Sequence, residues 1–169
     1  LHKSRDGYIY NRFTKKDING YEGEGIRGRV LVMPIEGLKL DFSGDYYHQD
    51  GAEALQTVSY VPLPFPPFNA QPTPDPVRRI VDLNAPIAGE RKVWGGAARA
   101  DYDLPGVRLT ALLGYREYPS RFQDDSDGLQ LDEFTVGRAE NGEISSQELR
   151  PTSKTDGPLS WIAGAYFYQ

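Results

Sequence analysis

The chain contains no cysteine, which excludes disulfides, thiol catalysis and cysteine-based metal sites and leaves the redox compartment undetermined. Its only histidines are His2 and His48, which leaves little material for a catalytic dyad or a histidine-based metal centre. No apolar run reaches the roughly 18 residues of a transmembrane helix. Residues 1–5 are not followed by the apolar stretch of a signal peptide.

Neither sign of charge strongly predominates. The net charge is -5 over 169 residues, and both signs are spread along the chain, so no basic patch indicates a nucleic-acid partner. The length suits one ordinary domain with a sizeable core. Eighteen glycines and eleven tyrosines, with few helical periodicities, predict an all-β fold.

The stretch from Glu24 to His48 is the clearest pair of strands. It predicts strands at 24–33 and 38–48, joined by a short turn at 34–37. Because side chains alternate along a strand, each strand has one mainly apolar wall and one charged wall. In the second strand the apolar parity carries Leu38, Leu40, Phe42, Gly44 and Tyr46.

The same alternation predicts further strands at 93–104, 107–118, 143–155 and 159–169, with the end of another at 4–10. The connections after residues 33, 104 and 155 are tight, whereas 49–92 and 119–142 are long and polar. The prolines of 62–76 exclude a helix or a central strand there. Short turns alternating with long loops are typical of up-and-down transmembrane barrels.

Strand length and aromatic placement favour the same interpretation. About 11 residues rising roughly 3.3 Å each and tilted about 45° cover the apolar band of an outer-membrane barrel. On the apolar parity, aromatic residues gather at the two strand ends, as girdles at the membrane interfaces would. They are Tyr46, Trp94, Tyr115 and Phe167 at the long-loop end, and Tyr102 and Trp161 at the short-turn end. Mid-strand residues Leu40, Phe42, Ala98, Leu109, Leu113 and Ala163 are expected to face lipid.

Four segments resemble the TonB-dependent outer-membrane receptors: residues 4–11, 40–46, 146–150 and 161–168. The likeness covers nearly all of the chain, and corresponds to the middle of such a receptor's barrel. It implies a barrel of about 22 strands with an amino-terminal plug, importing a scarce large nutrient with energy passed from the inner membrane. Pro151 departs from the family pattern and predicts a bulge in the strand at 143–155.

We therefore expect residues 1–169 to be part of one antiparallel up-and-down transmembrane β-barrel domain in the bacterial outer membrane. The partial barrel should be an open sheet of about six or seven strands, because the smallest closed barrels have about eight. The plug, which would contact the TonB complex, and the remaining strands are not in this segment. The expected partners are outer-membrane lipid and an unidentified small-molecule ligand; no cofactor or metal is expected.

Two groups of candidate site residues follow. Charged residues on the second parity are expected to face the barrel lumen, where each contacts the plug, lines the solute path or merely hydrates the wall. They are Arg27, Arg29, Asp41, Asp45, Arg99, Asp101, Arg108 and Arg116. The proline-rich 49–92 connection is expected to be extracellular, and its aromatic residues Tyr60, Phe65 and Phe68 to contact a bulky solute.

The residues leave two other functions open. A passive outer-membrane porin and a soluble β-sandwich used for binding are the alternatives to a receptor. Catalysis is not expected, because Asp45 and His48 have opposite parity. The G-x-G-x-x-G match at 23–28 lacks the helix that a phosphate loop needs, and Asp125 to Gly128 lacks the glutamate of a calcium loop.

Overall fold

The computed structural model describes residues 1–51, 64–154 and 157–169. Within these residues the fold is all-β, as predicted, and the only helical element is the single 3-10 turn η1 (Phe68–Ala70). No helix in the described part of the chain is long and apolar enough to cross a membrane.

The chain divides into two compact units. We call the first the sheet unit; it comprises Gly25–Tyr47, Val93–Tyr118 and Asn141–Gln169. We call the second the connection unit, because it contains both long connections; it comprises Leu1–Glu24, His48–Lys92 and Pro119–Glu140. Three long strands have residues in both units: β4 (Tyr21–Ile35), β5 (Leu38–Asp50) and β7 (Ala88–Leu104).

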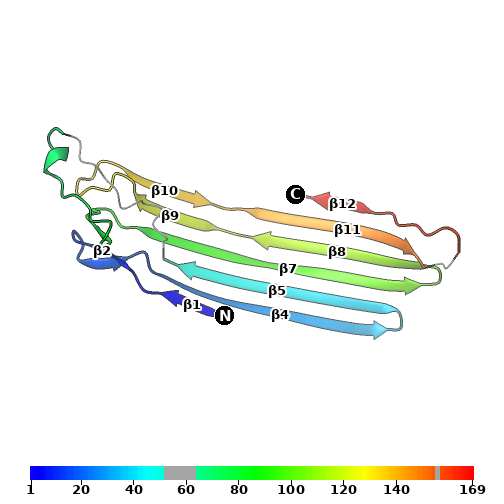
Figure 1. The fold of residues 1–169 in the computed structure, drawn as a ribbon. Helices are drawn as coiled ribbons and strands as arrows, with labels where there is room; N and C mark the ends of the chain where they lie inside the picture. The colour runs from blue at the N-terminus through cyan, green and yellow to red at the C-terminus, as the bar shows by residue number, and fades with distance from the viewer. Residues whose placement is uncertain (52–63, 155–156) are drawn as a thin grey trace. The chain divides into compact units, whose positions relative to one another are not determined.

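The sheet unit is a single layer of antiparallel strands in the order β4-β5-β7-β8-β11-β12 (Figure 1). The strands are β4 (Tyr21–Ile35), β5 (Leu38–Asp50), β7 (Ala88–Leu104), β8 (Val107–Glu117), β11 (Glu143–Ser153) and β12 (Ala165–Tyr168). Within the unit, β4 and β12 each have one neighbour, so the described sheet is not closed into a barrel. The prediction of an open antiparallel sheet is confirmed. The predicted number of about six or seven strands is too low, because three short strands of the connection unit extend the described sheet to nine.

Two tight turns have the backbone that their sequences predict. Gly37 follows β4 with φ +79°, and Gly106 follows β7 with φ +77°. This left-handed region is open to glycine without the steric cost that a Cβ brings. Pro105 before Gly106 presets the φ angle of the turn's first central position, so the hairpins end where the pattern predicts.

The strand register places the two parities on opposite faces. Ala98 pairs with Leu113 and Ala100 with Ala111, and across the next ladder Leu149 also pairs with Ala111. Paired residues of antiparallel strands share a face, so the apolar parities of β7, β8 and β11 form one continuous surface. We call this surface the apolar face of the sheet unit, and the opposite surface the polar face.

Two predictions about the last strands are wrong. Residues 159–164 are not a regular strand; only Ala165–Tyr168 forms β12. Nor does Pro151 cause a bulge, because it pairs in register with Leu109 of β8. Its carbonyl instead accepts a hydrogen bond from the Ala163 N–H at 3.1 Å. The edge of β11 on which Pro151 lacks an N–H therefore faces residues 159–164, where regular strand pairing is missing.

The connection unit has more strand than its sequence predicted. The predicted loop at 119–142 contains β9 (Ser120–Asp125) and β10 (Thr135–Glu140), which form a hairpin, and β9 also pairs with Ala88–Arg91 of β7. The first predicted strand, 4–10, is split into β1 (His2–Arg5) and β2 (Ile9–Asn11). β1 pairs with Tyr21–Glu24 of β4, and a second small sheet has the order β3-β2-β6, with β3 at Lys16–Ile18 and β6 at Ile80–Val81.

Among the described residues, the buried apolar core lies in the connection unit. Ile9, Val81 and Leu83 form one cluster, and Leu129 is buried elsewhere in that unit. The sheet unit, over its described residues, buries no hydrophobic side chain, and its one buried residue is Thr110. A single-layer sheet with an apolar face and no core needs something beyond itself to cover that face.

Candidate functional site

Large apolar side chains stand exposed across the apolar face. Ile26 is 74% exposed, Leu113 and Leu149 are each 55% exposed, and Phe42 is 47% exposed. Each would be stabilised by roughly 1.5 to 3 kcal/mol on full burial. An uncovered patch spanning several strands indicates a surface that meets lipid or another protein.

Aromatic residues lie at the ends of this face. Trp94 and Tyr115 pack on each other at the end of β7 and β8 that leads to the long connections, with ring centroids 5.4 Å apart. Near the opposite end, Tyr102 pairs with Leu109, and the carbonyl of Trp161 accepts a hydrogen bond from the Ser153 N–H. The strand register is thus compatible with two aromatic bands at separate depths.

The polar face carries a series of ion pairs. The Arg29 guanidinium lies 2.8 Å from Asp41, and Arg99 lies 2.7 Å from Asp101. Arg108 lies 2.7 Å from Asp103, which also pairs with Lys154 at 3.3 Å. Seven of the eight candidate lumen residues therefore share one face in charge-paired arrangements, the remaining pair being Asp45 and Arg116. Each exposed pair contributes little stability in water.

Asp45 and Arg116 come from strands that are not neighbours. Their side chains meet at 2.7 Å, although β7 lies between β5 and β8. Gly95 of β7 pairs with Arg116, and a Cβ there would lie 2.5 Å from the Tyr115 carbonyl oxygen. The absence of a side chain at Gly95 leaves the polar face open for Arg116 to reach across β7.

Arg27 differs from the other candidate lumen residues. Within residues 1–51, 64–154 and 157–169, no ion pair or hydrogen bond holds its guanidinium. It lines a depression on the sheet unit with Ser43, Asp45 and Arg116. Arg27 is therefore the candidate lumen residue whose charge is most available to a ligand or to another protein segment.

Phe65 and Phe68, two of the predicted ligand-contact residues, form an aromatic pair. Their rings meet edge to face with centroids 5.6 Å apart, and Phe65 is 51% exposed. A hydrogen bond from the Asn69 N–H to the Phe65 carbonyl closes this turn of the chain. The third predicted residue, Tyr60, lies outside the described residues.

Buried polar groups hold the connection unit together. The Asp82 carboxylate, 2% exposed, accepts hydrogen bonds from Nε of Arg12 at 3.0 and 3.1 Å and from Nε2 of Gln130 at 3.1 Å. The Asn11 side chain both accepts from the Leu83 N–H and donates to the Leu83 carbonyl. These bonds link residues far apart in sequence, and hydrogen bonding to Asp82 raises the pKa of Arg12.

The acidic stretch that begins at Asp125 organises a turn. Asp125, fully buried, accepts hydrogen bonds from the N–H groups of Ala85 and Gly128. Asp127 accepts from the N–H groups of Leu129 and Phe134. These carboxylates are occupied by backbone donors, as in an Asx turn, which agrees with the preference for a loop over a calcium site.

Burial raises the pKa of the Asp125 carboxyl above its ordinary value. The folded state therefore holds this proton more tightly than the unfolded chain does. The resulting contribution to stability is present below the unfolded carboxyl pKa and is lost as the pH rises through the folded value. We therefore expect wild type to lose stability relative to Asp125→Asn as the pH rises from about 3 to about 7. Denaturant unfolding across that range measures it, and a difference that moves the other way would contradict the assignment.

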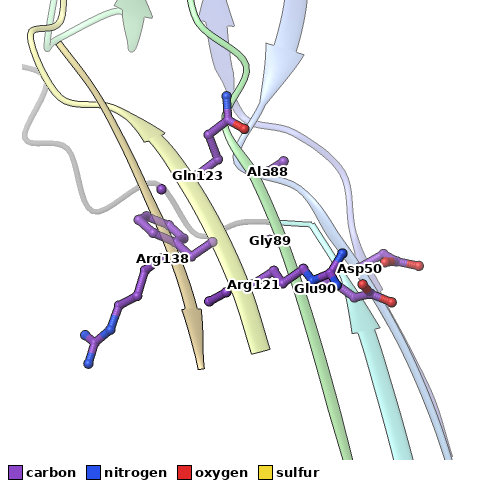
Figure 2. A pocket seen from close by; sticks show the side chains of 10 residues that line it. Asp50, Ala88, Gly89, Glu90, Arg121, Gln123 and Arg138 are labelled. Atoms are coloured by element: carbon purple, nitrogen blue, oxygen red, sulfur yellow. The ribbon is translucent and has the colours of Figure 1, made fainter. Parts of the chain in front are cut away.

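A pocket of about 570 Å³ lies in the connection unit between β7 and the β9–β10 hairpin. Ala88 and Glu90 of β7, Arg121 and Gln123 of β9, and Asp50 of β5 line it (Figure 2). Glu90 pairs with Arg121 across the ladder, and Figure 2 shows the Arg121 side chain running toward β7 while Arg138 points away from it. Sequence reasoning missed this pocket because it assigned both 49–92 and 119–142 to loops.

Glu90 is the most constrained acid of the pocket. A hydrogen bond from Lys92, whose Nζ lies 2.5 Å from Oε1, lowers the pKa of Glu90, and His48 adds to the effect. Asp50 contacts the same nitrogen of His48 as Glu90 does, with 3.4 Å between Oδ1 of Asp50 and Nε2 of His48. Asp45, by contrast, pairs with Arg116 in the sheet unit, so the structure brings His48 together with Asp50 and Glu90.

The glycine motif at 23–28 lies wholly within β4 and continues as strand. Comparison with protein-family models, with curated proteins and with solved structures gave no match.

Proposed function

We propose that this chain is part of the barrel of a TonB-dependent outer-membrane receptor. Such a receptor takes up a scarce, large solute, such as an iron–siderophore complex, with energy passed from the inner membrane. The observation that carries the membrane half of the proposal is the exposed apolar face of the sheet unit, opposite a face of ion pairs. Lipid on one side and water on the other would suit both surfaces of such a single layer.

The arrangement of connections supports the same proposal. The turns at Gly37 and Gly106 are tight, whereas 51–87 and the β9–β10 segment are long and carry the buried residues Val81, Leu83 and Leu129. Outer-membrane barrels have short periplasmic turns and longer extracellular loops. In this proposal the connection unit is extracellular, and its pocket and aromatic pair are available to a solute.

The receptor half of the proposal depends on the resemblance of four sequence segments to TonB-dependent receptors. Under the proposal, the polar-face charges line the lumen and meet a plug, with Arg27 the residue best suited to an anionic group. A passive porin would use the same strand pattern without a plug or energy input. A soluble sandwich would need a second layer over Phe42 and Leu113, which are exposed.

Fractionation and uptake separate these alternatives. The full-length protein should be found in the outer membrane, and deletion of its gene should abolish energy-dependent uptake of one class among iron chelates, cobalamin and saccharide ligands. Deletion of TonB should abolish the same uptake. Diffusion of small solutes that is lost with the gene but unaffected by TonB deletion would identify a porin. Recovery in the soluble fraction would contradict both.

The aromatic pair gives a residue-level prediction. Replacing Phe65 and Phe68 together with serine should lower ligand affinity by about two- to twelvefold, because aromatic contacts contribute about 0.5 to 1.5 kcal/mol beyond their buried area. Binding to cells carrying each variant measures this. Val77→Ser is the matched control, since Val77 lies in the same connection, is 91% exposed and lacks an aromatic partner. Equal affinity of the two variants would show that Phe65 and Phe68 do not contact the ligand.

A further inference from the structure

Three side chains that can ligate a metal converge in the connection unit. His48 and Asp50 lie two residues apart on β5, and Glu90 lies on β7, the next strand of the sheet. The Nε2 atom of His48 is 3.4 Å from Oδ1 of Asp50 and 3.3 Å from Oε1 of Glu90. The three ligand atoms all lie within 4.8 Å of one another, and Figure 2 shows the two carboxylates side by side.

The histidine nitrogen is the second observation that points to a ligand. Nε2 is buried from solvent, yet it makes no hydrogen bond of good geometry within the described residues. Asp50 and Glu90 lie 3.4 and 3.3 Å from Nε2, but a buried polar atom whose contacts form no good hydrogen bond costs free energy. An ion that accepts the imidazole lone pair would satisfy this atom, and the two carboxylates would supply the negative charge.

We propose that His48, Asp50 and Glu90 bind one divalent transition-metal ion of the Zn²⁺ class. Zinc ligands about 2.05 Å from the ion in a tetrahedron lie about 3.3 Å from one another. The two distances from Nε2 already match that edge, and rotation of either carboxylate can shorten the third. An imidazole favours zinc, nickel or copper over calcium and magnesium, which prefer oxygen ligands.

Two cations stand beside this site. Lys92 contacts Glu90 at Oε1, and Arg121 is the cross-strand partner of Glu90. In the metal-free protein Lys92 neutralises part of the acidic charge. A bound metal ion must either displace the Lys92 ammonium from Oε1 of Glu90 or bind Oε2 of Glu90. Lys92 therefore lowers the metal affinity.

The position of the site gives it a structural consequence. β5 leads into the connection at 51–87 and β7 follows it, so the metal would cross-link the two strands at its base. One such backbone link is already present, a hydrogen bond from the Gly51 N–H to the Gly89 carbonyl at 2.9 Å. Ligand exchange at this site would thus alter how firmly the ends of the connection are held.

Calorimetric titration with Zn²⁺ alone tests the site on the folded full-length protein, in detergent or in buffer according to its solubility. Wild type should bind one ion per chain, and His48→Gln and Glu90→Gln should each weaken binding by at least about 100-fold, the upper end of what loss of even an outer-shell partner costs. His2→Gln is the matched control and should leave binding unchanged. Lys92→Met should bind at least about threefold tighter.

Three outcomes would overturn the proposal. They are the absence of Zn²⁺ binding in wild type, equal loss in His48→Gln and His2→Gln, and Ca²⁺ or Mg²⁺ binding as tight as Zn²⁺. Co²⁺ gives a reading that does not depend on affinity, because four-coordinate and six-coordinate Co²⁺ differ strongly in visible absorption. Circular dichroism of each variant guards against misfolding, and Asp50→Asn replaces any variant that fails to fold.

Discussion

Replacing Phe42 with arginine is expected to destabilise the folded protein in lipid by about 2 to 4 kcal/mol. Phe42 lies in the middle of β5 on the apolar face and is 47% exposed. If that face meets acyl chains, the arginine must enter hydrocarbon, where a guanidinium is poorly solvated. Reversible denaturant unfolding in lipid vesicles measures the loss.

Ser43→Arg is the matched control, because Ser43 is the adjacent residue of β5 and points to the polar face. Its expected cost is under about 1 kcal/mol, since charged groups are solvated in a barrel lumen. Comparable losses from both variants would contradict lipid contact on one face only. Thr110, which sequence alone would offer as an equivalent control, is unsuitable because it is 4% exposed and donates a 2.7 Å hydrogen bond to Asp101.

Arg12→Met is expected to destabilise the connection unit by about 2 to 3 kcal/mol. The change removes the guanidinium from the Asp82 carboxylate, which is 2% exposed and would be left with only Gln130 as a side-chain partner. An ion left buried without its counter-ion costs more than the pair itself contributes. Hydrogen exchange of the amides of β2 and β6 measures the loss locally.

Arg78→Met provides the comparison for this effect. Arg78 pairs with Asp75 at 3.8 Å, and its side chain is 78% exposed. An exposed ion pair of this kind contributes about 0 to 1 kcal/mol, so the change should be close to neutral. If Arg78→Met costs as much as Arg12→Met, burial of Asp82 does not govern the effect.

Sequence periodicity was sufficient for the regular hairpins. Residues 24–33 and 38–48 alternate on either side of a glycine turn, and the structure has β4 and β5 there. The charged parity correctly groups Arg29 with Asp41 and Arg99 with Asp101, because a period of two fixes which residues share a face. Periodicity could not show that Arg116 reaches Asp45 across Gly95, since that contact depends on the pairing of distant strands.

The connections were less predictable for physical reasons. The β9 segment Ser120–Asp125 follows a proline and ends in two aspartates, a composition typical of a loop, yet it pairs with both β7 and β10. The two aspartates are buried, and burial raises the pKa of each. Tertiary pairing overrode local propensity there. Glu90 was missed for the same reason, because its role depends on β5 lying beside β7.

The face that meets lipid can be measured directly along β5. Since the chain has no cysteine, single cysteines at each position from 38 to 47 can carry a nitroxide label in the protein reconstituted into lipid vesicles. Collision rates with oxygen, which concentrates in lipid, and with a water-soluble nickel complex then report the surroundings of each residue. The account predicts a period of two, with oxygen favoured at Leu40, Phe42 and Gly44 and nickel favoured at Asp41, Ser43 and Asp45. Uniform nickel access along the strand, or protection of both parities from both reagents, would contradict a membrane-spanning sheet.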